Sequence, residues 1–252
     1  MSDSSPTSPP ASTPPPAPAA TWAEPPSGGP RATWGPGRVV VGILALLVGS
    51  ALEVGIVMAF DPDLSSVAGK VAAQAMLALT LVGIALAVTS GPDVDGARGA
   101  ALGLRRPQRS PFKVAGGVLA AYIVFAITYA NLVQPHQKDI PRDLGFGHGS
   151  AGVVAAVLLI AIAAPISEEI FFRGFIFGGM RRRLSFVPAA LISGVIFGIF
   201  HFTGASSATV VPLLAVLGFA LCFVYEETGS IYPTIAIHAI NNGIVLLSVA
   251  LA

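Results

Sequence analysis

Four polar side chains stand inside long apolar stretches in the second half of this sequence: Glu168, His201, His238 and Asn242. Ionisable groups at bilayer depth are costly unless they are paired or face a water-filled cavity, so they are functional candidates by default. A carboxylate beside an imidazole can activate a water, which predicts Glu168 as base with His201 beside it. His238 and the Asn242 amide can donate hydrogen bonds to the oxyanion. The residue types therefore predict peptide hydrolysis without a covalent intermediate.

Two further ionisable residues lie beside Glu168. Glu169 and Arg173 are four positions apart, the spacing of an intrahelical ion pair. On an α-helix Glu168 points about 100° away from Glu169. We therefore expect Glu169 and Arg173 to neutralise each other as structural support and to leave Glu168 free for chemistry. A lone buried glutamate or histidine can be purely structural, so the prediction depends on all four candidates converging.

Two helices joined by a tight turn near residues 184–185 must bring Glu168 and His201 together. Both residues lie at equal sequence distance from that turn, and equal distance along two helices means equal depth. The spacings Gly174–Gly178 and Gly194–Gly198 place small residues on opposite arms of this hairpin. Small residues let membrane helices approach closely, so we expect the glycines to pack the two arms together.

A third helix must bring the other two candidates. His238 and Asn242 are four apart and share one helix face. Asn241 is three from His238, close to the same face, and stays open as the polar partner. The rise per residue of an α-helix places His238 at the depth of Glu168 only if the end of the fourth span, Arg181–Arg183, extends about two turns out of the bilayer.

Composition places these helices in a membrane. The chain has 252 residues, of which 54% are hydrophobic and 11% charged, a composition too apolar for an ordinary soluble domain. A helix crosses the hydrocarbon core with about 20 apolar residues. We expect an all-α polytopic transmembrane bundle of about seven spans. The expected spans are Val39–Phe60, Val71–Thr89, Val114–Val133, Gly152–Met180, Val187–His201, Val210–Tyr225 and Ile231–Leu251.

The chain divides into a tail and a membrane domain. Residues 1–37 are dominated by Pro, Ser, Ala and Thr and predict a disordered tail, not a secretory signal peptide. Residues 38–252 form the helical domain, with 150–250 as its catalytic core. Lys and Arg are concentrated in the loops after the second and fourth spans, which predicts a multi-pass protein of the cell membrane with a cytoplasmic N-terminus.

Other protease chemistries fit the sequence less well. There is no His-Glu-x-x-His zinc helix, no Gly-x-Ser-Gly loop and no aspartate within an expected span. Cys222 has apolar neighbours and is expected to be an inert packed thiol. Glu168, His201 and His238 could still hold a zinc ion with one open position. Because asparagine is an unusual zinc ligand and an ordinary oxyanion donor, we favour metal-free hydrolysis with no required cofactor.

Three motifs in order resemble those of a known family. Glu168-Glu169-Ile-Phe-Phe-Arg173, Phe197-Gly-Ile-Phe-His201 and His238-Ala-Ile-Asn-Asn242 are similar to the Glu-Glu-x-x-x-Arg, Phe-x-x-x-His and His-x-x-x-Asn motifs of the CPBP family, the CAAX prenyl protease and bacteriocin-processing group. The resemblance covers about residues 150–250. It implies an intramembrane endopeptidase with Glu168 as base, His201 assisting, and His238 and Asn242 binding the oxyanion. Members have been described both as metalloproteases and as glutamate proteases.

The sequence thus predicts an intramembrane endopeptidase acting on a peptide or protein at the lipid bilayer, with no nucleic-acid partner. A non-catalytic membrane scaffold or immunity protein of the same family is the alternative. A proton-coupled transporter using Glu168 and the histidines as a relay ranks last, because no inverted repeat or pair of broken helices is present. The substrate, the metal dependence and the oligomeric state stay open at this point.

Overall fold

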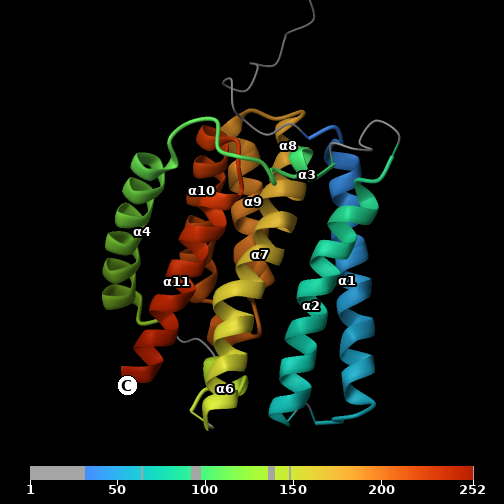
Figure 1. The fold of residues 1–252 in the computed structure, drawn as a ribbon, viewed down its shortest axis with the longest axis vertical. Helices are drawn as coiled ribbons and strands as arrows, with labels where there is room; N and C mark the ends of the chain where they lie inside the picture. Colours follow the sequence, from blue (N-terminus) through green and yellow to red (C-terminus); the bar gives the residue numbers. More distant parts are fainter. Residues whose placement is uncertain (1–31, 64, 92–97, 136–139, 148, 252) are drawn as a thin grey trace, which may run out of the picture.

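The computed structural model describes residues 32–63, 65–91, 98–135, 140–147 and 149–251. These residues form helices and loops without a β-strand (Figure 1). The helices are α1 (Pro36–Met58), α2 (Val67–Val88), α3 (Arg98–Ala101), α4 (Pro111–Val133), α5 (Ile140–Asp143), α6 (Gly149–Ala156), η1 (Val157–Ala163), α7 (Ala164–Glu168), η2 (Glu169–Phe177), α8 (Gly178–Arg181), α9 (Phe186–Phe200), η3 (Ala205–Ser207), α10 (Val210–Thr228) and α11 (Tyr232–Leu251).

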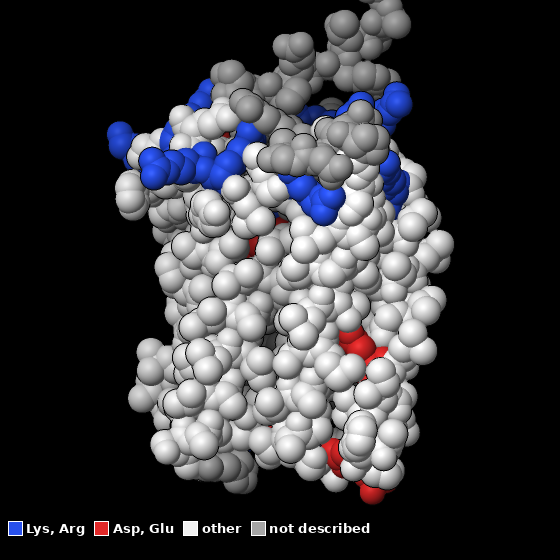
Figure 2. All heavy atoms as spheres, turned by 45° about the vertical axis from the view of Figure 1, so that its right-hand side comes forward, with Lys and Arg blue, Asp and Glu red and all other residues white. Residues whose placement is uncertain are grey.

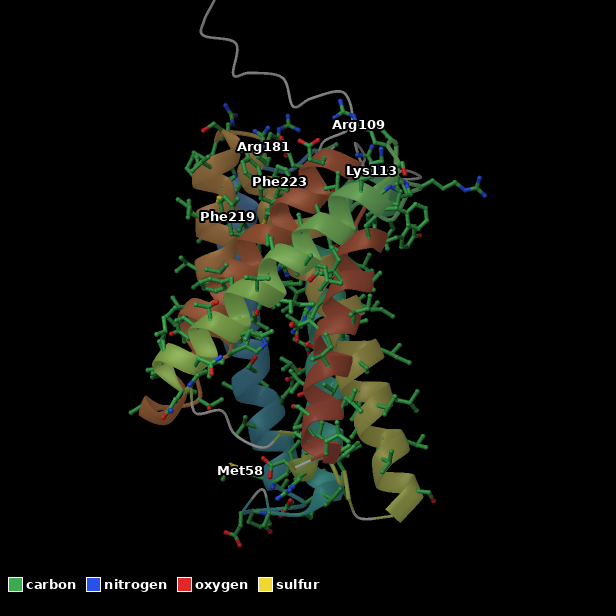
Figure 3. The ribbon with its side chains drawn as sticks, turned by 90° about the vertical axis from the view of Figure 1, so that its left-hand side faces the viewer. Met58, Arg109, Lys113, Arg181, Phe219 and Phe223 are labelled. Atoms are coloured by element: carbon green, nitrogen blue, oxygen red, sulfur yellow. The ribbon has the colours of Figure 1, made fainter. Side chains whose placement is uncertain are left out.

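The expected transmembrane bundle is confirmed. Among the described residues, 6 helices are long and apolar enough to cross a membrane, and the apolar helix Phe186–Phe200 is shorter. The fourth is one continuous helix of 33 residues, Gly149–Arg181, which runs from α6 to α8. In Figure 1, α1 and α2 stand on one side of it, α9 to α11 on the other, and α4 lies outermost. Figure 3 shows α4 crossing the bundle obliquely.

The start of the membrane domain lies earlier than the sequence indicated. The tail was expected to extend to residue 37, and residues 1–31 lie outside the described residues. Trp34 is nonetheless buried, and its indole Nε1 donates a hydrogen bond to the Phe175 carbonyl at 2.9 Å. Arg182 also donates to the Thr33 carbonyl at 2.6 Å. Residues 32–35 are therefore packed against the end of the fourth span, and α1 begins at Pro36.

The glycine pairs pack against other partners than expected. A Cβ on Gly198 would meet the Val211 carbonyl oxygen at 2.5 Å, and one on Gly194 would meet the Ala215 oxygen at 2.7 Å, so both glycines pack against α10. A Cβ on Gly174 would meet the Leu102 oxygen at 2.5 Å. The prediction that these glycines join the two arms of the hairpin is wrong. The small residues instead admit the backbones of α10 and of the segment after α3, because only a missing side chain leaves room for a main chain.

Charge separates the two ends of the bundle. The Lys and Arg side chains visible in Figure 2 gather at one end. Arg109, Lys113 and Arg181 lie at that end and Met58 lies near the opposite one (Figure 3). We call the end that carries Arg109, Lys113 and Arg181 the basic end. Here Arg181 Nη2 contacts Glu226 Oε1 at 2.6 Å, which ties the fourth span to α10.

Candidate active site

The fourth span departs from a regular α-helix on both sides of Glu168. The segments η1 and η2 are π-helical, and α7 lies between them with Glu168 as its last residue. Pro165 in α7 has no backbone N–H, and its ring crowds the carbonyl of the preceding turn, which a wider turn accommodates. π-Helical turns occur mostly at functional sites. They also hold more residues per turn than an α-helix, which changes which residues of η1 and η2 share a face.

Glu168 lies between two imidazoles. Its Oε2 atom is 3.8 Å from Nε2 of His201 and 3.7 Å from Nε2 of His238. The same oxygen is buried and accepts no hydrogen bond within the described part of the chain. Both separations exceed a direct hydrogen bond, and a single bridging atom can satisfy contacts of this length. The structure therefore brings Glu168, His201 and His238 together from three helices.

Glu169 contacts two other residues of the cluster through one carboxylate oxygen. Arg173 Nη1 contacts Glu169 Oε1 at 2.8 Å, and both side chains are 0% exposed. His238 Nδ1 contacts the same oxygen at 2.9 Å. The ion pair matches the expected spacing, but Glu169 also holds an imidazole, which the sequence did not indicate. Because an ionised carboxylate only accepts hydrogen bonds, Nδ1 of His238 carries the proton here and Nε2 is turned toward Glu168.

His201 is held by the backbone one turn before it. Its Nδ1 lies 2.8 Å from the Phe197 carbonyl oxygen. A carbonyl only accepts, so Nδ1 is the donor and the neutral ring presents Nε2 as an acceptor. The Phe197 ring packs edge-on against both imidazoles, with centroid distances of 4.8 Å to His201 and 5.6 Å to His238. The Arg173 guanidinium lies 4.4 Å from the centre of the same ring, a cation–π contact.

Asn242 makes its hydrogen bonds outside the cluster. Its Nδ2 donates to the Ile160 carbonyl in η1 at 2.9 Å, and its Oδ1 accepts from Asn241 at 3.3 Å. No polar contact joins Asn242 to Glu168, His201 or His238 in the part of the chain that the structure describes. One amide hydrogen stays available, because an NH₂ group has two. Asn241, kept open as an alternative, is therefore a neighbour that orients Asn242.

The donor set is of a kind that binds zinc, but its arrangement is not. Two imidazole nitrogens and a carboxylate oxygen are ordinary zinc ligands. Each imidazole also has its Nδ1 fixed, as metal-binding histidines do. The described residues nevertheless contain no group of three or more His, Cys, Asp or Glu side chains with the separations that hold a metal ion. Glu168, His201 and His238 thus fit a metal by chemistry and not by geometry.

Two supporting residues escaped the sequence analysis. Phe197 was noted as part of a motif without a role, yet it contacts both imidazoles and Arg173. Its position four before His201 was the available signal, since that spacing lets its carbonyl reach the ring. Ser193, also on α9, is buried and donates to the Phe172 carbonyl at 3.2 Å. It fastens α9 to η2 beside the cluster, and nothing in its sequence surroundings distinguishes it.

Comparison with known proteins supports the family resemblance of the three motifs. Residues 150–244 match the family model described as type II CAAX prenyl endopeptidase Rce1-like. Over 91 residues the chain is 36% identical to "Putative membrane peptidase YdiL" of Bacillus subtilis (strain 168), which covers 36% of each protein. Over 107 residues it is 30% identical to "UPF0177 protein YxdF" of Lactococcus lactis subsp. lactis (strain IL1403), 42% of this chain and 57% of the relative. No solved structure matches. The chain spans between about a third and little over half the length of these relatives.

Proposed function

Residues 150–244 belong to the CPBP family, and on that premise we propose that this protein is an intramembrane endopeptidase that uses Glu168 as a general base. The matched residues contain every member of the cluster. One observation carries the proposal: a buried carboxylate oxygen, with no hydrogen-bond partner among the described residues, lies 3.7 Å and 3.8 Å from two imidazole nitrogens. A buried acceptor left unsatisfied is costly. Such an arrangement is expected where a water or a substrate atom binds.

In the proposed reaction the water lies between Glu168 and His201. It donates one hydrogen to Glu168 Oε2 and the other to Nε2 of His201, which the Phe197 carbonyl keeps as an acceptor. These two bonds leave a lone pair of the water oxygen free to attack a peptide carbonyl. Glu168 takes the proton as the oxygen adds to the carbonyl carbon and returns it to the leaving amine nitrogen.

Charge balance supports His238 as an oxyanion donor. Ionised Glu168 and Glu169 with cationic Arg173 leave one negative charge in an environment where net charge is costly. A proton on His238, held by Glu169 at 2.9 Å, makes the cluster neutral and turns Nε2 into a donor. The negative oxygen that forms during attack is then stabilised by His238, with the second amide hydrogen of Asn242 as the other donor. Glu169 and Arg173 act as positioning residues.

We propose that the reaction needs no metal, since the chain's own groups supply the base and both oxyanion donors. If a zinc ion is bound, Glu168, His201 and His238 would hold it, and it would polarise the water. Dialysis of the purified protein against a chelator tests this. Unchanged cleavage after dialysis is expected, whereas a loss that added zinc restores would contradict metal-free hydrolysis.

We further propose that the protein lies in the cell membrane with the basic end in the cytoplasm. Arg105, Arg106 and Arg109 lie between α2 and α4, and Lys113 lies in the first turn of α4. The fourth span ends at Arg181, and two further arginines follow it. The opposite loops carry no such excess, since Lys70 pairs with Asp143 at 2.7 Å and the loop between α1 and α2 holds Asp61 and Asp63. An excess of Lys and Arg in short loops marks the cytoplasmic side.

Replacement of the base tests the proposal. Glu168→Gln keeps the size of the side chain but cannot take a proton, so cleavage of peptides by purified protein is expected to fall by about 10²–10⁴-fold. His201→Ala is expected to reduce cleavage as well. Both variants should accumulate in membranes as the parent does, because Glu168 Oε2 makes no hydrogen bond that holds the fold. Full biological activity in both variants would instead indicate a scaffold or immunity role.

A further inference from the structure

Packing around the fourth span changes at Glu168. Every residue from Ser167 to Gly179 is buried, on the side of Glu168 that leads to the basic end. On the other side, from Ser150 to Ala163, only Ala156 is buried. The polar cluster therefore lies at the boundary between a densely packed half of the bundle and a half with a smaller core, made of Leu144, Ala156 and Leu246.

The other two helices of the cluster change in the same direction. On α9, Phe197 and Gly198 are buried, but no residue from Ile199 to Gly204 is. On α11, His238 is buried and none of residues 239–245 is. His201 and Asn242, the members farthest along these helices from the basic end, are partly exposed, with the His201 side chain 23% exposed and that of His238 3%.

The route from the basic end is filled by protein. The segment after α3 enters the bundle, with Leu102 0% exposed and its carbonyl against Gly174. Gly103, with φ +85°, sits against the buried Tyr225 ring, where a side chain would meet it at 2.7 Å. Trp34 covers the end of the same span near Gly179. These residues lie between the cluster and the basic end and cover the cluster on that side, whereas His201 and Asn242 stay partly exposed.

We infer that the site opens toward the membrane face opposite the basic end and takes its peptide from there. With the basic end in the cytoplasm, the substrate is an extracytoplasmic segment of an exported or membrane-anchored polypeptide, not a cytoplasmic chain terminus. The inference rests on the proposed function for its substrate and for the cytoplasmic location of the basic end. The burial along the three helices supports the direction of the opening. Exposure to lipid alone would give the same burial, so the test must detect water.

Accessibility to a water-soluble thiol reagent tests the direction of the opening. The native Cys222 is buried and should not react with the reagent, so the parent protein is the unlabelled control. Asn242→Cys reports on the site, Thr203→Cys on the loop after His201, and Arg183→Cys on the basic end. A charged, membrane-impermeant maleimide is applied to intact cells and to inverted membrane vesicles. We expect labelling of Asn242→Cys and Thr203→Cys in cells with loss of labelling in vesicles, and the reverse for Arg183→Cys.

Two results would overturn the inference: Asn242→Cys labelled only in inverted vesicles, or Asn242→Cys unlabelled from both sides while Thr203→Cys reacts in cells. If Asn242→Cys does not accumulate, Asn241→Cys takes its place in the same comparison.

Reporter peptides separate this inference from the proposed function. The same peptide is tethered to one membrane anchor on the outer face or on the inner face, and Glu168→Gln serves as the inactive control. Cleavage of the outer reporter alone supports both ideas. Labelling from outside with neither reporter cleaved supports the opening and contradicts the protease. Cleavage of the inner reporter alone, with Asn242→Cys labelled in vesicles, supports the protease and overturns the opening.

Discussion

The α1–α2 pair buries one glutamate inside the bundle, the cluster on the fourth span, α9 and α11 buries two, and the surroundings of these glutamates differ. Glu53 on α1 receives a hydrogen bond from the Thr80 hydroxyl on α2, and no ion pair involving it is found among the described residues. Glu169 contacts both Arg173 and His238. A hydroxyl satisfies a carboxyl group without fixing its charge, whereas a buried arginine requires an ionised partner. Burial of an acid therefore does not by itself make a site; convergence of charged and titratable groups does.

The largest expected effect on the fold comes from breaking the charge compensation in the cluster. Arg173→Met leaves Glu169 buried without its cation and is expected to destabilise the protein by about 3–5 kcal/mol. Thermal unfolding in detergent measures the change. Arg109→Met is the matched control: it breaks an exposed pair with Glu227, 3.2 Å apart, and is expected to cost about 0–1 kcal/mol. Equal effects of the two variants would show that the cluster is not held by charge.

The second test compares helix packing at α9, which carries part of the cluster, with packing at α1. Gly198→Ala puts a methyl group against the Val211 carbonyl on α10, where a Cβ would lie 2.5 Å from the oxygen. We expect a loss of about 1–3 kcal/mol, because a backbone must move. Gly55→Ala on α1 is the control, since nothing lies within 4 Å of its Cβ. It is expected to be neutral or to stabilise the helix by about 0.5–1 kcal/mol. Unfolding midpoints that fall equally would contradict the difference in packing.

A smaller effect is expected at Glu53. Glu53→Gln keeps an oxygen that accepts from Thr80, so stability should change by no more than about 1 kcal/mol. Peptide cleavage should equal that of the parent, in contrast to Glu168→Gln. A loss of cleavage comparable to that of Glu168→Gln would mean that the α1–α2 pair belongs to the reaction, and the comparison between the two regions would fail.

The smallest expected effect is a local dependence on pH outside the spans. The Ser66 hydroxyl donates to Asp61 at 2.8 Å and the Ser66 backbone N–H at 2.9 Å. These hydrogen bonds lower the pKa of Asp61 below its ordinary 3.8. A lowered pKa in the folded state means that Asp61 stabilises the start of α2 above pH 3.8 and loses this effect as the pH falls through the lowered value.

Hydrogen exchange at the amides of Ser65 and Ser66 measures this effect. Exchange protection should decrease at acid pH in the parent and should be independent of pH in this range for Asp61→Asn. Protection that falls equally with pH in both proteins would show that another group is responsible. Cleavage in the site should not follow this titration, since Asp61 lies in the loop between α1 and α2.

Composition and spacing alone predicted the bundle and the encounter of Glu168 with His201. Apolar runs about 20 residues long can only be satisfied as helices in a bilayer, and equal distances from one turn imply equal depth. The four-residue spacing of Glu169 and Arg173 likewise predicted their contact, because it is local.

Only the tertiary structure decided which nitrogen of each imidazole faces Glu168 and that Glu169 holds His238. The tertiary structure likewise decided that Asn242 donates to the Ile160 carbonyl and makes no polar contact with the cluster among the described residues. It also decided that the Gly194–Gly198 pair packs on α10. These features depend on how each helix is rotated about its axis and on contacts between segments far apart in the sequence. Regular helical spacing describes one helix at a time, so it fixes depth and shared faces but not which neighbour each face meets.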